Sequence, residues 1–269
     1  MKVAVLGLGE AGSTLAADLA RFGDEVHGYD PAPVPGPPGV TREDGPEAAV
    51  AGCSLVLAVT AGSRASDALT QVLGSLERGV VYADLSTGSP SLKEALADRV
   101  EPTARFADVA VMAPVPGRGL AAPALASGSG AAEYAHLINA RGGQVEVVGE
   151  RAGQAAARKL LRSVVMKGLA ALLIESTEAA NRYGEGEWFW NHLVKQLGSM
   201  DEAMMERLLF ATAIHAPRRV EEMEAARDLL TDLGLPATMT SATLAHLDRL
   251  LEGGMPEVYR RTSINPTEE

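Results

Sequence analysis

Three glycines near the start of the chain have the types and spacing needed to bind phosphate groups. They form the pattern Gly-x-Gly-x-x-Gly between an apolar run over residues 2–6 and a helical pattern over residues 13–21. In such a pattern the first glycine permits a tight turn, the second lets the backbone approach a pyrophosphate, and the third lets helix and strand pack closely. The N-terminus of the helix adds free N–H groups for the phosphates. The sequence therefore predicts that a dinucleotide binds at Gly7, Leu8, Gly9, Glu10, Ala11 and Gly12.

An acidic residue stands at the end of the second strand-like run. Asp30 directly follows residues 25–29 and comes after the helix that begins at the glycine pattern. A carboxylate at this position accepts hydrogen bonds from the adenosine ribose hydroxyls and repels a 2′-phosphate. We therefore expect NAD or NADP as the cofactor, with NAD favoured by Asp30.

Small and polar residues follow the next apolar run, residues 54–60. Thr60 and Ala61 stand at its carboxyl end, which is where open α/β sheets bind their ligands. These two residues are predicted to contact the nicotinamide side of the cofactor. Arg64, in the loop beyond, is expected either to reach a cofactor phosphate or to be a solvated loop arginine.

Ser86, Thr87 and Gly88 follow another strand-like run, residues 80–85. Hydroxyl groups at the end of a strand can cap the helix that comes next, and Pro90 fits its first turn. The same hydroxyls would also face the cofactor crevice. From the residues alone, a capping role and a binding role both remain open.

Three polar residues lie along one stripe of a long, mostly apolar helix that the sequence predicts over residues 151–184. Lys159, Ser163 and Lys167 recur every four residues and so share one side of the helix. Between residues 155 and 183 there is no proline and one glycine, Gly168, so nothing forces a break. A polar stripe on an otherwise apolar helix is either a salt-bridged seam or a functional site.

The order of the predicted elements indicates how these residues are positioned. Strand-like and helical runs alternate up to Gly149, which is typical of a parallel sheet, and only helical patterns follow Gly184. We expect an α/β fold: an N-terminal Rossmann-type, doubly wound, mostly parallel sheet, followed by an all-α C-terminal domain joined by a long interdomain helix. The predicted domains are a dinucleotide-binding domain over residues 1–150 and a helical substrate and dimerisation domain over residues 151–269. Residues after Gly254 are predicted to form a frayed tail.

Composition limits the partners. The formal net charge is −11, which opposes binding to nucleic acid or to an anionic membrane. Cys53 is the single cysteine and lies among apolar residues, so no disulfide framework is expected. His192, His215 and His246 lack the spacing of metal ligands, so no metal is expected. Without a leader-like or membrane-spanning run, the sequence predicts a soluble cytoplasmic protein.

The segment from Asp84 to Pro90 carries the pattern Asp-x-Ser-Thr-x-x-Pro, which resembles the substrate-binding signature of the β-hydroxyacid dehydrogenases. This superfamily includes 6-phosphogluconate dehydrogenase, 3-hydroxyisobutyrate dehydrogenase, tartronate semialdehyde reductase and the imine reductases. The long helix resembles their interdomain helix, with Lys159 at the position of the catalytic lysine, Ser163 at that of an asparagine and Glu175 at that of an acid. The amino-acid sequence of this helix is most similar to that of a poorly characterised 6-phosphogluconate-dehydrogenase-like branch of the superfamily, with an extra lysine at Lys167.

The resemblance implies an NAD(P)-dependent oxidoreductase that transfers a hydride between nicotinamide and a small hydroxy acid, or its keto or semialdehyde form. Lys159 would be the general acid and base, and Lys167 would share or replace that role. Ser86, Thr87, Gly88 and Ser163 would contact a small substrate, expected to bear a carboxylate. Relatives pack their helical domains across a two-fold axis, so the resemblance also implies a homodimer.

One segment departs from the family pattern. Met112, Ala113 and Pro114 stand where relatives carry the serine and glycines that hold the substrate carboxylate. Arg118 is a candidate substitute donor, and its alternative reading is a surface loop arginine. The alternatives for the whole chain are an imine reductase-like enzyme and a non-catalytic NAD(P)-binding protein.

Overall fold

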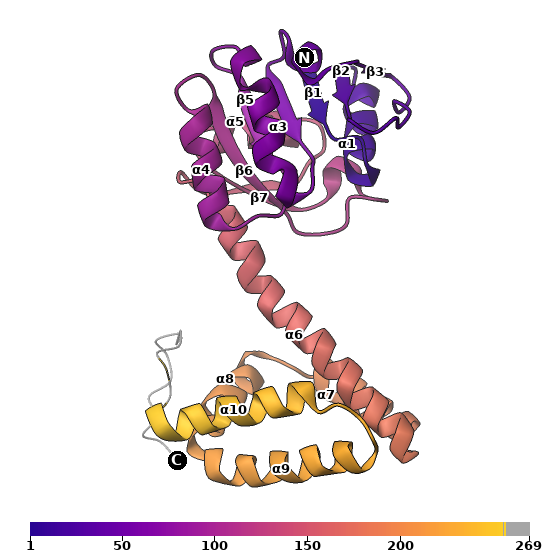
Figure 1. Cartoon of the computed structure of the whole chain (residues 1–269), viewed down its shortest axis with the longest axis vertical. Helices are drawn as coiled ribbons and strands as arrows, with labels where there is room; N and C mark the ends of the chain where they lie inside the picture. Colours follow the sequence, from indigo (N-terminus) through magenta and orange to yellow (C-terminus); the bar gives the residue numbers. More distant parts are fainter. Residues whose placement is uncertain (255, 257–269) are drawn as a thin grey trace. The chain divides into compact units, whose positions relative to one another are not determined.

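The computed structural model describes residues 1–254 and 256 (Figure 1). The chain forms two compact units, Met1–Val164 and Val165–Glu269. The division falls inside a long helix, whereas the sequence placed the domain boundary between residues 150 and 151, just before that helix. The boundary at residue 150 therefore stays a prediction. The predicted frayed tail after Gly254 lies, except for residue 256, outside the described residues.

An eight-stranded sheet forms the centre of the first unit, in the order β3-β2-β1-β4-β5-β6-β7-β8. All neighbouring strands pair in parallel except β6 and β7, so the predicted mostly parallel sheet is confirmed. The strands are β1 (Lys2–Leu6), β2 (Glu25–Tyr29), β3 (Val40–Arg42), β4 (Leu55–Ala58), β5 (Val81–Asp84), β6 (Arg105–Val111), β7 (Ala124–Ser127) and β8 (Val145–Gly149).

Helices cover both faces of this sheet, as expected for a doubly wound fold. One face packs against α1 (Glu10–Arg21) and α5 (Ala131–Asn139). The other packs against α2 (Pro46–Val50), α3 (Ala65–Val72) and α4 (Pro90–Val100), and Figure 1 shows α3 and α4 over this face. Three short 3₁₀ turns complete the unit: η1 (Gly62–Arg64), η2 (Leu73–Ser75) and η3 (Gly119–Ala121).

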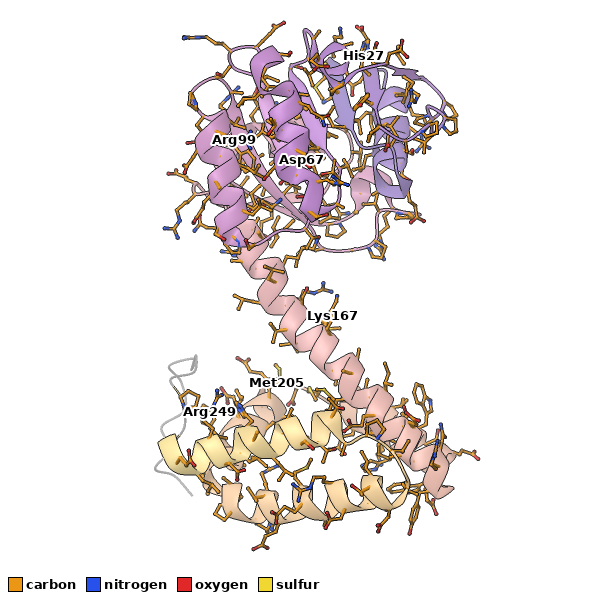
Figure 2. All side chains as sticks on the ribbon, in the orientation of Figure 1. His27, Asp67, Arg99, Lys167, Met205 and Arg249 are labelled. Atoms are coloured by element: carbon orange, nitrogen blue, oxygen red, sulfur yellow. The ribbon has the colours of Figure 1, made fainter. Side chains whose placement is uncertain are left out.

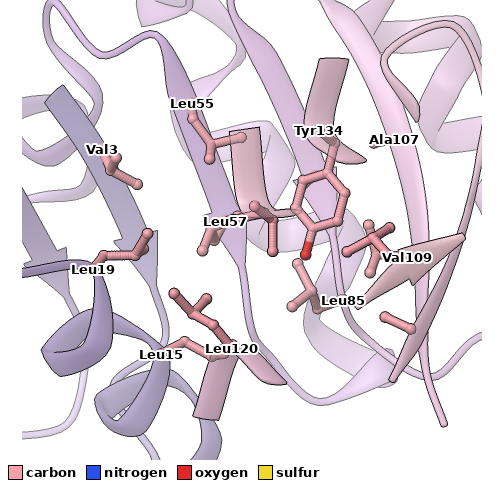
Figure 3. Close-up of a cluster of buried hydrophobic side chains, with 14 of the residues drawn as sticks. Val3, Leu15, Leu19, Leu55, Leu57, Leu85, Ala107, Val109, Leu120 and Tyr134 are labelled. Carbon is pink, nitrogen blue, oxygen red and sulfur yellow. The ribbon is translucent and has the colours of Figure 1, made fainter. Parts of the chain in front are cut away.

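The alternation of side chains along each strand builds two apolar cores. On β1, Val3 belongs to the core under α1 and α5, whereas its neighbour Ala4 belongs to the core on the opposite face. Successive strand residues point to opposite faces, so a strand that is buried on both faces is apolar throughout. Figure 3 shows Leu15 and Leu19 of α1 and Tyr134 of α5 around the strand residues of the first core.

A thirty-residue helix, α6 (Gln154–Tyr183), follows the sheet and confirms the predicted long helix. Its first part, up to Val164, belongs to the first unit, and the rest belongs to the second.

The second unit continues with α7 (Gly186–Gly198), α8 (Glu202–Ile214), α9 (Ala216–Asp232) and α10 (Thr238–Gly253), which confirms its all-helical prediction for the described residues. Ala179 of α6 packs with Leu230 of α9 and Leu235 in a small apolar core. The carboxylate of Glu175 accepts hydrogen bonds at 2.8 Å from the backbone N–H groups of Met239 and Thr240.

Glu175 therefore caps the start of α10, where N–H groups have no partner within the helix. Burial alone would raise its pKa, but the hydrogen bonds from Met239 and Thr240 outweigh burial and lower the pKa below the usual value.

Cys53 lies between α2 and β4 and is buried. Its thiol donates a hydrogen bond to the carbonyl of Ala49 at 3.3 Å. Burial raises the pKa of this thiol to about 11. A thiol that stays protonated at neutral pH is a poor nucleophile, so Cys53 is a packing residue.

Candidate functional site

A cleft of about 520 Å³ opens at the carboxyl ends of β1, β2 and β4. The sheet order reverses between β1 and β4, and open α/β sheets bind their ligands at such a point. The predicted cofactor residues that line the cleft are Gly7, Gly9, Asp30, Thr60, Ala61 and Arg64. The structure thus brings together residues that are far apart in the sequence.

The three glycines of the pattern have different local geometries. Gly7 has a φ of +97°, and a Cβ there would lie 2.3 Å from the carbonyl oxygen of Val59. A Cβ on Gly12 would lie 1.9 Å from the carbonyl oxygen of Gly7, so helix and strand meet too closely for any side chain. A Cβ on Gly9, in contrast, would meet no atom within 4 Å. Gly9 therefore leaves open the backbone surface that a pyrophosphate would approach.

The residues between these glycines lie outside the lining of the cleft. Leu8 is buried in the core under α1, and its side chain fills the space beside Gly28. Glu10 is exposed in the first turn of α1, and Ala11 is partly buried next to it. Of these three, Leu8 contributes through its backbone, because its N–H donates a hydrogen bond to Asp30.

Asp30 follows β2, and its carboxylate is already oriented by the backbone. Oδ2 accepts the N–H of Leu8 at 2.7 Å, and Oδ1 accepts the N–H of Ala32 at 2.8 Å. Arg42 of β3 holds the same loop, since its guanidinium donates to the carbonyl oxygens of Asp30 and Ala32 at 3.0 Å. The acid is therefore fixed at the edge of the cleft, where a ribose would lie.

Thr60 supplies a second polar group to the cleft. Its Oγ1 atom is buried and has no hydrogen-bond partner in the described structure. Buried hydroxyls are almost always paired, so this atom is suited to a ligand that fills the cleft. Arg64 is exposed, with its Nη1 atom 3.5 Å from Oδ2 of Asp67, a contact of surface type. An orphaned hydroxyl, an open glycine and an oriented carboxylate fit a dinucleotide.

A second, smaller crevice contains the predicted substrate residues Ser86, Thr87 and Gly88 together with Lys159. The Nζ atom of Lys159 donates a hydrogen bond to Oγ1 of Thr87 at 3.2 Å. The helix α6 thus presents its first predicted catalytic lysine to the segment that follows β5. Ser86 is buried, and its hydroxyl donates to Oδ2 of Asp84 at 3.0 Å.

The capping alternative for this segment is also resolved. The hydroxyl that caps α4 belongs to Ser89, which accepts the N–H of Leu92 at 3.2 Å. Ser86 and Thr87 are therefore not used as the cap, which leaves the hydroxyl of Thr87 beside Lys159.

Next to the crevice lies a buried ion cluster that was not predicted from the sequence. Lys93 of α4 is 1% exposed, and its ammonium donates to Oδ2 of Asp84 at 2.8 Å and to the carbonyl of Ser86 at 2.7 Å. Its Nζ atom also lies 3.6 Å from Oδ1 of Asp108 on β6.

A signal for this cluster exists in the sequence. Lys93 shares one face of α4 with Leu96, Ala97 and Val100, which are all buried, so it occupies a core position of an apolar stripe. A lysine at such a position requires a buried acid as its partner.

Asp108 connects this cluster to the start of α6. Its Oδ2 atom accepts the backbone N–H groups of Gly153 and Ala156, both at 3.0 Å, and the hydroxyl of Ser127 at 3.1 Å. These N–H groups stand at the N-terminus of a helix, where they lack partners within the helix and favour negative charge.

The remaining predicted site residues are not brought into these two pockets. Arg118 precedes η3, which contacts α1 through a hydrogen bond from Leu120 to Asp18, and Arg118 lines neither the cleft nor the crevice. Ser163 lies one turn beyond Lys159 on α6 and is partly buried. Lys167 is exposed on α6 in the second unit (Figure 2). Their roles stay predictions.

Within residues 1–254 and 256, no group of three or more His, Cys, Asp or Glu side chains could hold a metal ion. Across the same part of the chain, every helix is too short or too polar to cross a membrane.

Comparisons with known proteins agree with this geometry. Residues 2–124 match the model of the NAD binding domain of 6-phosphogluconate dehydrogenase, and residues 180–250 match a domain of unknown function, DUF1932. A curated, uncharacterised 28.5 kDa protein of Methanothermus fervidus is 27% identical over 143 residues, which is 53% of this chain. The matched region spans about half of that relative's own length, 55%.

Solved structures extend the match over almost the whole chain. A conserved hypothetical protein from Sinorhizobium meliloti is 30% identical, with a TM-score of 0.62, over 92% of this chain and 87% of that one. A conserved protein of unknown function, described as structurally similar to 3-hydroxyacid dehydrogenases, is 30% identical over 94% of this chain and 97% of its own, with a TM-score of 0.63. A reductive aminase from Aspergillus terreus in complex with NADPH is 20% identical, over 94% and 95% of the two chains, with a TM-score of 0.78. At 20% identity, the similarity to the reductive aminase shows a shared fold alone.

Proposed function

The chain belongs to the NAD(P)-binding, 6-phosphogluconate dehydrogenase-like family of oxidoreductases, and from that premise we propose that it transfers a hydride between nicotinamide and a small hydroxy acid or its keto or semialdehyde form. The observation that carries the proposal is the hydrogen bond of Lys159 to Thr87 in the smaller crevice. An ammonium and a hydroxyl at this distance can both contact one substrate oxygen.

The cofactor would lie in the cleft at the ends of β1, β2 and β4. Gly9 would leave room for the pyrophosphate, and Asp30 would accept hydrogen bonds from the adenosine ribose. Thr60, whose hydroxyl has no partner in the described structure, would donate to the cofactor near the nicotinamide. Because Asp30 would repel a 2′-phosphate, we propose NAD as the preferred cofactor over NADP.

The bound nicotinamide supplies the hydride acceptor or donor, and the protein supplies the proton chemistry. In the oxidative direction, Lys159 in its neutral form would take the proton of the substrate hydroxyl. In the reductive direction, the ammonium returns that proton to the oxygen. Thr87, held 3.2 Å from Nζ, orients the lysine, and Lys167, two helical turns further along α6, is the alternative acid and base.

We also propose that the substrate bears a carboxylate. Its donors would come from the cationic and polar residues that the sequence singled out, with Arg118 and Ser163 as candidates. A substrate with an imine in place of a carbonyl would need the same hydride and a proton on nitrogen, so imine substrates belong in the screen. A protein that binds the cofactor without turnover is the remaining alternative.

Lys159→Ala tests the proposal. Wild-type protein is titrated with NADH and with NADPH by fluorescence, and turnover is screened with 2- and 3-hydroxy acids and with cyclic imines. The variant should bind the cofactor normally and lose about 100-fold or more in kcat, because an acid–base catalyst contributes roughly that much. Lys195→Ala, at an exposed position of α7, is the matched control and should keep wild-type turnover. Unchanged turnover in Lys159→Ala would overturn the lysine role.

We also propose a homodimer in the cytoplasm. Several large apolar side chains of α6 and α7 are exposed in the single chain, among them Val164 at 72%, Ile174 at 67% and Trp190 at 60%. Soluble proteins rarely expose many large apolar side chains without a partner, and symmetric dimers are the commonest solution.

A further inference from the structure

Three buried polar residues form a row across the sheet at the crevice, which Asp108 itself lines. Asp84 pairs with Asp108 on the neighbouring strand, and Asp108 pairs with Ser127 on the strand after that. All three are at most 1% exposed. Two carboxylates side by side on neighbouring strands repel each other, so the row requires a cation.

Lys93 supplies that cation from α4. The three hydrogens of its ammonium go to the carbonyl oxygen of Asp84 at 3.0 Å, to Oδ2 of Asp84 at 2.8 Å and to the carbonyl oxygen of Ser86 at 2.7 Å. A lysine has three such donors, so none remains for Asp108. The Oδ1 atom of Asp108 lies 3.6 Å from Nζ of Lys93 and has no hydrogen-bond partner in the described structure. The attraction between the two opposite charges is therefore its main interaction with Lys93.

The N-terminus of α6 also stabilises the negative charge of Asp108. Asp108 accepts the N–H groups of Gly153 and Ala156, and the hydroxyl of Ser127 accepts the N–H of Ala155 at 3.0 Å. The start of α6 also lies directly on the start of α4, because a Cβ on Gly153 would meet the backbone of Pro90 at 2.9 Å. The cluster thus connects the first turn of α6 to the segment that follows β5.

We propose that Lys93 is a positioning residue, which fixes the Ser86–Gly88 segment and the first turn of α6 against each other so that Lys159 meets Thr87. Lys159 lies one turn beyond Ala156, and its contact with Thr87 spans the two parts that Lys93 joins. Lys93 is fully buried and touches neither the cleft nor the solvent, so it acts through its neighbours. That the contact between Lys159 and Thr87 serves hydride transfer rests on the proposed function.

Hydrogen exchange of Lys93→Met, followed by mass spectrometry, tests the positioning without any substrate. Peptides over residues 84–92 and 153–160 should exchange about tenfold faster together, since they lose the same shared support. Peptides of β1, β2 and α1 should not change, and NADH affinity should match that of the wild type. Lys195→Met, which removes an exposed lysine of α7, is the matched control and should leave all these peptides unchanged.

A variant with an unchanged net charge in the cluster distinguishes a positioning role of Lys93 from a role in balancing charge. The cluster of Asp84, Asp108 and Lys93 carries one net negative charge, and Lys93→Met with Asp84→Asn keeps that charge while losing the ammonium bond to Ser86. The double variant should fold, and residues 84–92 should still exchange faster. With the hydroxy acid that wild-type protein oxidises fastest, kcat should fall about 100-fold with KM for NAD unchanged, because small misplacements cost that much.

The outcomes decide the inference separately from the proposed function. If both segments of Lys93→Met exchange as in the wild type, Lys93 is a counter-ion only. The same conclusion follows if the double variant has the hydrogen exchange and the kcat of the wild type. Should Lys93→Met fail to fold, the double variant still decides. If no substrate is turned over by wild-type protein, the proposed function fails, and the exchange data still show whether Lys93 joins the two segments.

Discussion

Oδ2 of Asp30 accepts the backbone N–H of Leu8 at 2.7 Å, which joins the loop after β2 to the glycine turn after β1. The residue expected to select the cofactor therefore also holds the turn expected to bind its phosphates. A change at Asp30 should alter both cofactor preference and the order of the glycine turn.

Asp30→Asn should shift the preference from NADH towards NADPH. The amide oxygen keeps an acceptor for the N–H of Leu8, while its NH₂ group cannot accept the N–H of Ala32, and the charge that repels a 2′-phosphate is removed. We expect the ratio of the two dissociation constants, measured by fluorescence titration, to change by roughly tenfold, which corresponds to about 1.4 kcal/mol. Asp67→Asn, an exposed acid at the rim of the same cleft, is the control. An unchanged ratio would mean that Asp30 does not select the cofactor.

Gly12→Ala should destabilise the first unit and abolish cofactor binding. The added Cβ would lie 1.9 Å from the carbonyl oxygen of Gly7, and neither backbone can move freely. Overpacking of this kind costs about 3 kcal/mol, measurable as a lower urea midpoint. Gly168→Ala is the opposite control: a Cβ there meets no atom within 4 Å, so the helix should gain about 0.5 kcal/mol. Equal stability of the two variants would contradict the close approach of α1 and β1.

Glu175→Gln should weaken the N-terminus of α10. The variant retains an acceptor oxygen but loses the negative charge that faces Met239 and Thr240, at a cost of about 1 kcal/mol. Exchange of the amides at the start of α10 should accelerate, while the sheet of the first unit is unaffected. Glu178→Gln, one turn away on α6, should leave these amides as they are.

Arg141→Met should destabilise the protein by about 2 kcal/mol near neutral pH, because Asp24 loses two charged hydrogen bonds. Burial alone would raise the pKa of Asp24, but the bonds from Arg141 and the ammonium of Met1 outweigh it and hold the pKa below its usual value. A lowered pKa stabilises the fold above about pH 4, and that stabilisation is lost as the pH falls through the folded pKa.

The difference between wild type and Arg141→Met in urea unfolding should therefore shrink below about pH 4. Arg78→Met, which removes an exposed arginine, gives the baseline. A difference that stays constant from neutral to acid pH would show that Arg141 contributes by packing only.

Sedimentation velocity tests the homodimer. Wild-type protein at micromolar concentration should sediment as a dimer, and Ile174→Glu with Trp190→Glu should sediment as a monomer, since charges on a covered apolar face oppose association. The double substitution changes exposed side chains of α6 and α7, so the helices themselves should keep their circular dichroism. If the wild-type protein sediments as a monomer, the proposed homodimer is wrong.

Much of the fold could be read from the sequence because its signals are local. The apolar run before Gly7, the spacing of the glycines and the absence of proline in α6 each determine an element without reference to distant residues. The strand β3 has no comparable local signal, since it lies in the segment between Pro31 and Pro46 that is rich in proline and glycine. Its three residues form a strand because β2 offers an open edge, which is a tertiary effect.

The candidate site could be predicted in part. The glycine pattern, Asp30 and Lys159 stand in recognisable motifs, and the structure places them in a cleft and a crevice. Lys93 was missed because its partners, Asp84 and Asp108, become neighbours only when β5 and β6 pair in register. Arg118 lines neither pocket, because it precedes η3, whose Leu120 bonds to Asp18 of α1, so its role as a carboxylate donor stays a prediction.

The buried thiol of Cys53 has a practical consequence. With a pKa raised to about 11, it should stay inert towards maleimides at neutral pH, so the wild-type chain is close to a cysteine-free background. One cysteine introduced at Arg78 and another at Lys195, both exposed, would take a pair of dyes without further engineering. Energy transfer between those dyes, with and without NADH, would then test whether the cofactor changes the distance between the two labelled positions.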